Sequence, residues 1–309
     1  MALLNETANG VYVIAVTPFT ETGALDLDST DRMVDFYLEK GATGLTLLGM
    51  MGEAPKLTAD ESRRLVRHVL KRTAGRVPIV VGVSGPGLAA MAELTHAVMD
   101  DGAAGVMVAP PSSLRTDDQI VGYYDMVGEA IAGAPLVLQD FPLTTQVQFT
   151  PKVILTIVER LSNLVMLKHE DWPGLAKLSA LRAASDAGKT RRISILVGNG
   201  GVFLPEELSR GADGAMTGFA YPEMMVDVWR AHTAGNIDRA HDLFDAYLPL
   251  ARYEQQPGPG LAIRKHVLAR RGVIASATLR KPSAVLSAAD IADIERLIAR
   301  QTRRLKELG

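Results

Sequence analysis

The sequence predicts an α/β protein, a (β/α)8 TIM barrel followed by an all-helical C-terminal extension. Eight short apolar runs alternate with helical patterns through the first two-thirds of the chain, and eight βα units close such a barrel. Similar glycine-containing turns precede several of the runs. The strand signal ceases after Pro222 and only helical patterns follow.

The eight apolar runs are expected to form the strands. They are continuous rather than alternating, which is typical of parallel strands covered on both faces. Three of them follow the related turns Gly41–Gly44, Gly102–Gly105 and Gly211–Gly214, as repeated αβ units would. The expected strands are Val11–Val16, Gly44–Leu48, Val77–Val83, Gly105–Ala109, Leu136–Gln139, Leu164–Lys168, Ile193–Val197 and Gly214–Thr217.

The helices between the strands have recognisable start and stop signals. Capping boxes are expected at Thr58–Glu61 and Thr116–Gln119, and Thr150 precedes a first-turn proline. The helical pattern 28–40 runs into Gly41, a residue suited to ending a helix.

A C-terminal group of helices is expected at Met224–Ala234, Ile237–Tyr253, Gly260–Arg271 and Ala288–Leu308, with a stiff break at Gln256–Gly260. No long linker separates these helices from the barrel, so we expect them to pack on it. The predicted domains are therefore a catalytic barrel over residues 1–235 and a helical domain over residues 236–309.

The composition is that of a soluble globular protein. The chain has 309 residues, 47% of them hydrophobic and 22% charged, with a formal net charge of −2. Such a charge gives no reason to expect nucleic acid or a membrane surface as partner. Cysteine is absent, which excludes disulfide and thiolate chemistry. No signal-peptide pattern and no apolar run of roughly 18 residues is seen, so we expect a cytoplasmic protein.

Lys168 is the main candidate for chemistry. It closes the apolar run Leu164–Leu167, and the carboxyl ends of barrel strands are where active sites lie. An amine partly buried there is a usable nucleophile toward carbonyl groups, whereas the alternative is a lysine that only extends its ammonium group to solvent. The histidines lie in helical patterns without metal-ligand spacing or directly after Lys168, so no metal and no other cofactor is expected.

Over nearly its full length the chain resembles the dihydrodipicolinate synthase / N-acetylneuraminate lyase family. The resemblance rests on the segment Gly10–Phe19, the motif Gly49-x-x-Gly-Glu53, the Asp140-x-Pro142 turn, Lys168 and the helical tail. It implies a (β/α)8 barrel with C-terminal helices, usually a homotetramer, in which Lys168 forms an imine with a small-molecule 2-oxo acid substrate.

The departures from the family pattern argue against a dihydrodipicolinate synthase. Met50 and Met51 replace two threonines, and Gln139 replaces the catalytic tyrosine of that family. A second tyrosine falls near Ser112, and the arginine that holds a second carboxylate aligns with Thr144.

A narrower branch, the L-2-keto-3-deoxyarabonate dehydratases and similar sugar-acid dehydratases, shares other motifs with the chain. The shared features are Gln139-Asp-x-Pro, Lys168-x-Glu170, Ala215–Gly218 before Tyr221-Pro222, and Leu248-Pro-Leu near Glu254 and Gln255. The methionine pair departs from this branch too, which leaves the substrate open.

The expected catalytic residues are Lys168, Gln139 and Glu170. An amide cannot transfer protons, so Gln139 is expected to orient a water or a substrate hydroxyl. Glu170 is either an acid/base group or a carboxylate that neutralises a helix N-terminus. The expected substrate-binding residues are Met50 and Met51 (through their backbone), Ser112, Gly198, Asn199, Met216 and Thr217.

Three neighbouring residues have structural interpretations. Asp140 is either a base or, preferably, a turn-forming residue. Glu53 is expected to cap backbone groups under the site, and His169 to pack on the side of its strand opposite Lys168.

Three functions remain open from the sequence. The first is a hydro-lyase that dehydrates a 2-keto-3-deoxy sugar acid through a Lys168 imine. The second is an aldolase that releases pyruvate, or a related condensing enzyme. The third is a non-catalytic protein that binds a 2-oxo acid.

Overall fold

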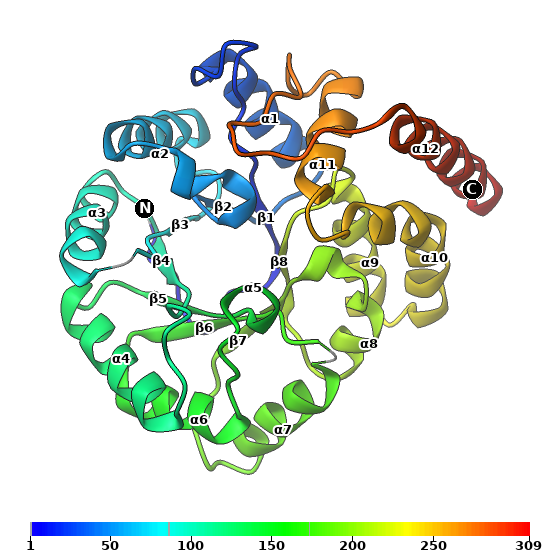
Figure 1. Cartoon of the computed structure of the whole chain (residues 1–309). Helices are drawn as coiled ribbons and strands as arrows, with labels where there is room; N and C mark the ends of the chain where they lie inside the picture. The colour runs from blue at the N-terminus through cyan, green and yellow to red at the C-terminus, as the bar shows by residue number, and fades with distance from the viewer. Residues whose placement is uncertain (1, 86, 173) are drawn as a thin grey trace.

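Eight parallel strands form a closed barrel in the chain order β1 to β8 (Figure 1). The computed structural model describes residues 2–85, 87–172 and 174–309. The strands are β1 Gly10–Ile14, β2 Gly44–Leu47, β3 Ile79–Gly82, β4 Gly105–Val108, β5 Leu136–Asp140, β6 Leu164–His169, β7 Ser194–Val197 and β8 Gly214–Thr217. The predicted fold class is confirmed, and all eight predicted strands are present with ends shifted by at most two residues.

Every residue of the eight strands is buried, which explains why the strands appear as continuous apolar runs in the sequence. One set of side chains fills the barrel interior, including Tyr12, Met107 and Met216. The alternate set, including Leu45 and Leu167, packs against the surrounding helices. The barrel is therefore a packed core, and its functional groups lie at the strand ends.

Helices surround the barrel (Figure 1). They are α1 Leu27–Glu39, α2 Ala59–Thr73, α3 Leu88–Asp100, α4 Asp117–Ala130, α5 Pro142–Thr145, α6 Pro151–Arg160, α7 Leu175–Asp186, α8 Leu204–Ser209 and α9 Pro222–Thr233. The capping boxes at Thr58 and Thr116 and the cap at Thr150 are confirmed. None of the helices in the described part of the chain is long and apolar enough to cross a membrane.

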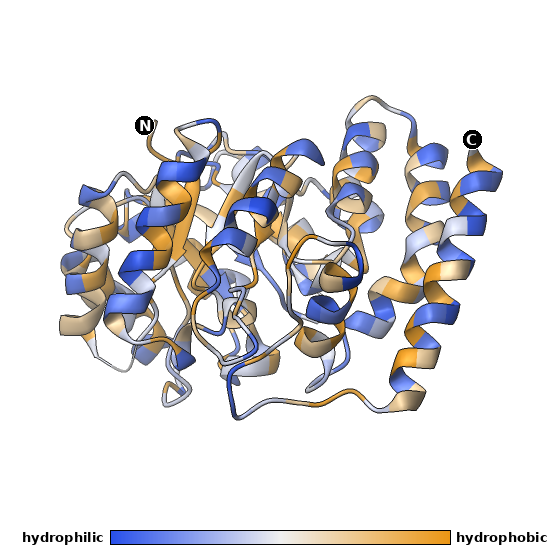
Figure 2. Cartoon of the chain, turned by 90° about the horizontal axis from the view of Figure 1, so that it is seen from above, coloured by the Kyte–Doolittle hydropathy of each residue, from blue (hydrophilic) through white to orange (hydrophobic). Residues whose placement is uncertain are grey.

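The C-terminal extension consists of α10 Ile237–Glu254, α11 Gly260–Arg270 and α12 Ala288–Leu308. Helix α10 packs against both α9 and α12, and Figure 2 shows the helix that ends at the C-terminus at one flank of the barrel. The predicted domain division at 235/236 falls in the turn between α9 and α10. Buried ion pairs fix the extension: Lys265 Nζ lies 2.7 Å from the Glu53 carboxylate, which belongs to the loop after β2.

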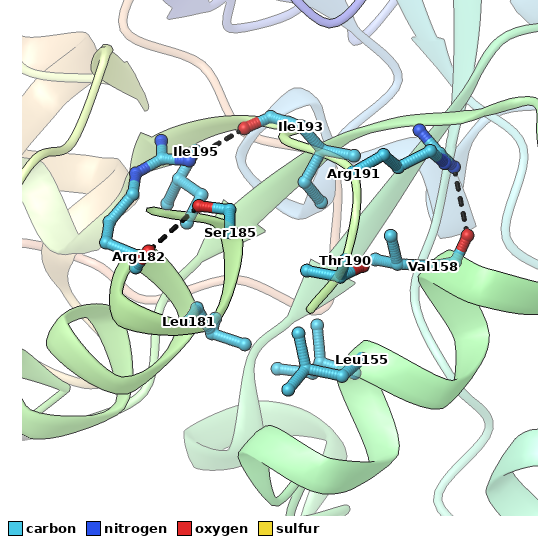
Figure 3. A pocket seen from close by; sticks show the side chains of 10 residues that line it. Leu155, Val158, Leu181, Arg182, Ser185, Thr190, Arg191, Ile193 and Ile195 are labelled. Carbon is cyan, nitrogen blue, oxygen red and sulfur yellow. Dashed lines mark hydrogen bonds between the residues drawn. The ribbon is translucent and has the colours of Figure 1, made fainter. Parts of the chain in front are cut away.

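A small hollow of about 20 Å³ lies between α6, α7 and β7 (Figure 3). Apolar side chains such as Leu155 and Ile193 line it, and the Arg191 guanidinium donates to the carbonyls of Val158, Leu161 and Leu164 beside it. A space of this size holds about one water molecule. It is a packing gap outside the strand ends, and its arginine is structural.

Candidate active site

A cavity of about 410 Å³ lies at the carboxyl ends of the strands. Gln139 at the end of β5 and Lys168 at the end of β6 are register neighbours, so their side chains enter the cavity side by side. Its other walls come from the 3₁₀ turn Met50–Gly52, from Asn199 and Thr217, and from residues 254–264 of the extension. This is where (β/α)8 enzymes place their active sites.

Lys168, Glu170 and Gln139 form one hydrogen-bonded group. Lys168 Nζ lies 2.7 Å from Glu170 Oε2, and Gln139 Nε2 donates to the same oxygen at 2.7 Å. All three residues are at most 5% exposed and line the cavity. Burial makes an unpaired charge costly, so the two opposite charges stabilise each other here. The three predicted catalytic residues are thus brought together.

Glu170 bonds to cavity side chains rather than to a helix. Its carboxylate contacts Lys168 and Gln139, so the alternative in which it only neutralises a helix N-terminus has no support in its contacts. Gly198 packs behind it, because a Cβ at position 198 would lie 2.2 Å from Glu170 Cγ. Asn199 Nδ2 donates to the Glu170 carbonyl at 3.1 Å and also lines the cavity.

The methionine pair forms part of the cavity wall. Both Met50 and Met51 line the cavity, and they open a 3₁₀ turn in which Gly52 and Glu53 donate to the carbonyls of Gly49 and Met50. The N–H groups of the two methionines are the first of this turn, where such groups lack intrahelical partners.

Three predicted substrate-binding residues do not line the cavity. Ser112 is exposed, and its carbonyl accepts a hydrogen bond from Arg115. Met216 is fully buried in the barrel interior, because strand alternation turns it into the packed core beneath the site. Gly198 supports Glu170 from behind, as described above. Thr217 does line the cavity, and its Oγ1 accepts from Gly200 N at 2.9 Å.

Asp140, His169 and Glu53 all lie away from the cavity. His169 packs opposite Lys168 as predicted, with its Nε2 3.0 Å from the Gly174 carbonyl. Asp140 is neither a base in the cavity nor a turn residue, since it ends β5 and binds Lys177 Nζ at 2.8 Å. Glu53 accepts one backbone N–H, from Arg280, but its main partners are two ammonium groups rather than the backbone groups that we expected.

Residues of the C-terminal extension complete the cavity. Arg264 on α11 is 2% exposed, and its Nε donates to Glu254 Oε1 at 2.6 Å. Burial raises the pKa of Glu254 above its ordinary value, and the Arg264 guanidinium opposes that rise. Gln255 follows α10 and lines the same space. Sequence reasoning noticed Glu254 and Gln255 only as a motif and missed Arg264, which lies in a helical pattern far along the chain from the strand ends.

The model of the dihydrodipicolinate synthetase family matches residues 7–301 of the chain. The chain belongs to this family. It is 32% identical over 277 residues to L-2-keto-3-deoxyarabonate dehydratase of Azospirillum brasilense, covering 88% of each protein. It is 29% identical over 252 residues to 4-hydroxy-tetrahydrodipicolinate synthase of Thiobacillus denitrificans, covering 79% of this chain and 81% of that enzyme.

A dihydrodipicolinate synthase structure from Rhodopseudomonas palustris superposes with a TM-score of 0.95 at 51% identity, covering 97% of this chain and 100% of that one. The dihydrodipicolinate synthetase family includes Schiff-base lyases and synthases. Among the residues that the structure describes, no group of His, Asp or Glu is arranged to hold a metal ion.

Proposed function

We propose that this protein is a Schiff-base hydro-lyase that dehydrates a 2-keto-3-deoxy sugar acid through an imine on Lys168. The observation that supports it most is the buried group in which Lys168 Nζ and Gln139 Nε2 share one oxygen of Glu170 at the wall of a 410 Å³ cavity. An amine, a carboxylate and an amide within hydrogen-bond reach supply a nucleophile, an acid/base group and an orienting group.

The first step joins the substrate to the protein. Glu170 accepts a proton from Lys168, and the free amine attacks C2 of the 2-oxo acid and releases its oxygen as water. The backbone of the Met50–Gly52 turn holds the substrate carboxylate in this arrangement. The resulting protonated imine withdraws electrons from C3 and raises the acidity of its protons.

The second step is elimination. A base takes one proton from C3, the electron pair moves toward C4, and the C4 hydroxyl leaves as water after it receives a proton. Loss of a C5 proton and tautomerisation of the enol give the terminal aldehyde, and hydrolysis of the imine frees Lys168. The water released when the imine forms returns at hydrolysis, so the substrate loses one water overall. Glu170 is the group placed to move these protons.

Elimination is favoured over carbon–carbon cleavage because cleavage needs a base at the C4 hydroxyl. Gln139 and Met50 occupy the positions of the family's tyrosine and threonine, and neither side chain accepts a proton at neutral pH. No tyrosine is present among the described residues that line the cavity. The dehydratase name of the Azospirillum brasilense relative agrees with this proposal.

A condensing or aldolase activity is the second candidate, and the synthase name of the Rhodopseudomonas palustris structure favours it. The test is incubation with a panel of 2-keto-3-deoxy acids, with separate assays for semialdehyde and pyruvate. We expect semialdehyde with little pyruvate, and we expect Gln139→Tyr not to improve the reaction. Stoichiometric pyruvate plus an aldehyde from the best substrate would instead establish the aldolase.

Other properties are proposed on the family resemblance alone. We expect a homotetramer by light scattering at micromolar concentration, with the C-terminal helices in part of the contact surface, and a monomer would contradict this.

Activity should survive EDTA, because an imine supplies the electron sink that a metal would otherwise provide. A non-catalytic 2-oxo acid binder would form no imine, so borohydride distinguishes it from the enzyme.

A further inference from the structure

Two buried hydrogen-bond donors on residues of the cavity wall have no partner among the described residues. Among the described residues, Gln255 Nε2 and Arg264 Nη1 are buried side-chain atoms without a hydrogen bond, and both residues line the cavity that contains Lys168. Leaving a buried donor unsatisfied costs about 1–3 kcal/mol, and more when the group is charged. Both donors belong to residues that line one cavity, so the oxygens of a ligand bound there can supply the missing acceptors.

The Gln255 amide is held above the loop that follows β7. A Cβ at position 200 would lie 2.2 Å from Gln255 Nε2, so the amide rests directly on the backbone of Gly200. The Gly200 N–H in turn donates to Thr217 Oγ1 at 2.9 Å, which ties this loop to the end of β8. The amide therefore has a fixed support.

Arg264 is positioned in the same way over the end of β8. Its Nε is engaged by Glu254 and its Nη2 donates to the Gly218 carbonyl, while Nη1 lies where a Cβ at position 218 would come within 2.2 Å. The guanidinium is 2% exposed. Two of its nitrogens thus fix its orientation, and the third has no acceptor among the described residues.

The charges around the cavity indicate which chemical groups the ligand carries at this end. Lys168 is paired with Glu170, and Arg264 with Glu254, so the two ion pairs contribute no net formal charge. A second carboxylate would find no excess positive charge, whereas a hydroxyl or carbonyl oxygen needs only a donor. A cavity of 410 Å³ also has room for more than a three-carbon acid, since a water occupies about 30 Å³ in the liquid.

We propose that Gln255 and Arg264 determine substrate specificity by binding hydroxyl or carbonyl oxygens at the end of the substrate farthest from C2. The inference rests on the proposed imine at Lys168, which fixes the 2-oxo acid end at the strand ends and leaves the rest of the chain to extend toward residues 254–264. The C-terminal extension then selects polyhydroxylated acids over short ones.

The experiment compares a substrate that has a distal end with one that lacks it. Pyruvate has no distal hydroxyl, so its rate of borohydride trapping reports on Lys168 alone. For Gln255→Leu we expect that rate to stay within about twofold, while the KM for a 2-keto-3-deoxypentonate rises about 3- to 10-fold, the loss of one neutral hydrogen bond. Arg264→Lys keeps the charge opposite Glu254 but loses both Nη1 and the Nη2 hydrogen bond to the Gly218 carbonyl, and we expect a rise in the same KM of about 10- to 100-fold.

The matched comparison is Gln256→Leu, because Gln256 lines the same cavity but its amide already donates to the Tyr253 carbonyl at 2.8 Å. If Gln256→Leu and Gln255→Leu raise the KM for the pentonate equally, the effect belongs to the loop as a whole and the inference is overturned. The inference would also be overturned if the variants impaired pyruvate trapping as much as they impaired the reaction of the pentonate. Gln255 and Arg264 would then act on Lys168 itself. If no 2-oxo acid can be trapped on the wild-type protein, the proposed function fails and this inference fails with it.

Discussion

The protein buries two lysines in similar ways, and only one of them is placed for chemistry. Lys168 Nζ and Lys265 Nζ each lie 2.7 Å from a glutamate oxygen, of Glu170 and Glu53 respectively. Each also lies near an aromatic ring, at 6.0 Å from the centroid of Phe141 for Lys168 and 4.4 Å from that of Phe19 for Lys265. Burial and an ion pair are common to both.

The two lysines differ in what surrounds the amine. Lys265 Nζ also donates to the Thr278 carbonyl at 2.9 Å, and its partner Glu53 is shared with Lys56 and Arg280. Burial lowers the pKa of Lys265, with Glu53 opposing the shift, yet the side chain is enclosed and does not line the cavity. Lys168 adjoins an open cavity. A buried lysine becomes a candidate nucleophile only where a carbonyl compound can reach it.

The largest effect is expected at Lys168. Lys168→Arg should abolish both imine trapping and turnover, because a guanidinium stays protonated and cannot condense with a ketone. Mass spectrometry after treatment with pyruvate and borohydride should place the added mass on Lys168 and leave Lys265 unmodified. Lys189→Arg, at an exposed position, is the control and should behave as wild type. Added mass on Lys265 would break the comparison.

Lys265 is expected to matter for stability instead. Lys265→Met leaves the Glu53 carboxylate without its closest partner, and breaking a buried ion pair costs about 3–5 kcal/mol. Urea denaturation should show this loss, and the double variant Lys265→Met/Glu53→Gln should recover part of it. The folded single variant should still be trapped by pyruvate at Lys168. If the folded variant cannot be trapped, Lys265 has a role in the site.

Glu170 provides a second test of the difference between the two lysines, because we propose that it transfers protons whereas Glu53 only pairs with Lys265. Glu170→Gln keeps the shape of the side chain but cannot accept a proton, so kcat should fall by about 10²-fold or more. Steady-state kinetics on the best 2-keto-3-deoxy acid measures this. The exposed Glu159→Gln is the control. A kcat within about threefold of wild type would mean that Glu170 only holds Lys168 in place.

The buried Glu207 on α8 tests how burial changes the protonation of a carboxyl group that forms no ion pair among the described residues. Burial raises its pKa to about 8, with Glu206 adding to the rise, and its Oε2 has no hydrogen-bond partner. The folded state therefore holds a proton that the unfolded state loses above its ordinary pKa, so stability falls as pH rises toward 8 and is level beyond it.

Glu207→Gln removes this dependence. We expect it to stabilise the protein by about 1–3 kcal/mol at pH 8 and by progressively less as the pH approaches 5. Thermal denaturation at several pH values measures the effect. A gain that is constant across this range would contradict the raised pKa.

The sequence predicted the barrel and the position of Lys168 at a strand end well because both leave local signals. The run Leu164–Leu167 marks β6, and Lys168 directly follows it, so its place at the strand end required no knowledge of distant contacts. Alternation also placed His169 correctly. The same rule places Met216 on the inner face of the barrel, but it does not tell whether a residue on that face lies in the packed core or in the cavity.

The missed residues depend on contacts between distant parts of the chain. Arg264 lies beside Gly218, 46 positions earlier in the sequence, and nothing around it distinguishes it from the basic residues of an ordinary surface helix. The prediction that Ser112 lines the cavity was wrong for a related reason. Ser112 follows a strand, but in the loop after β4 it is exposed. Loop direction and the packing of separate helices leave little trace in a single sequence.

The cavity wall formed by residues 254–264 has a consequence for how such enzymes diversify. Lys168 is encoded near the middle of the chain, and the proposed distal donors Gln255 and Arg264 are encoded after the barrel is complete. Recombination near the turn between α9 and α10 would exchange the cavity wall of the extension without altering Lys168. Chimeras that join this barrel to the tail of a relative are thus a direct way to transplant substrate range while keeping the same chemistry.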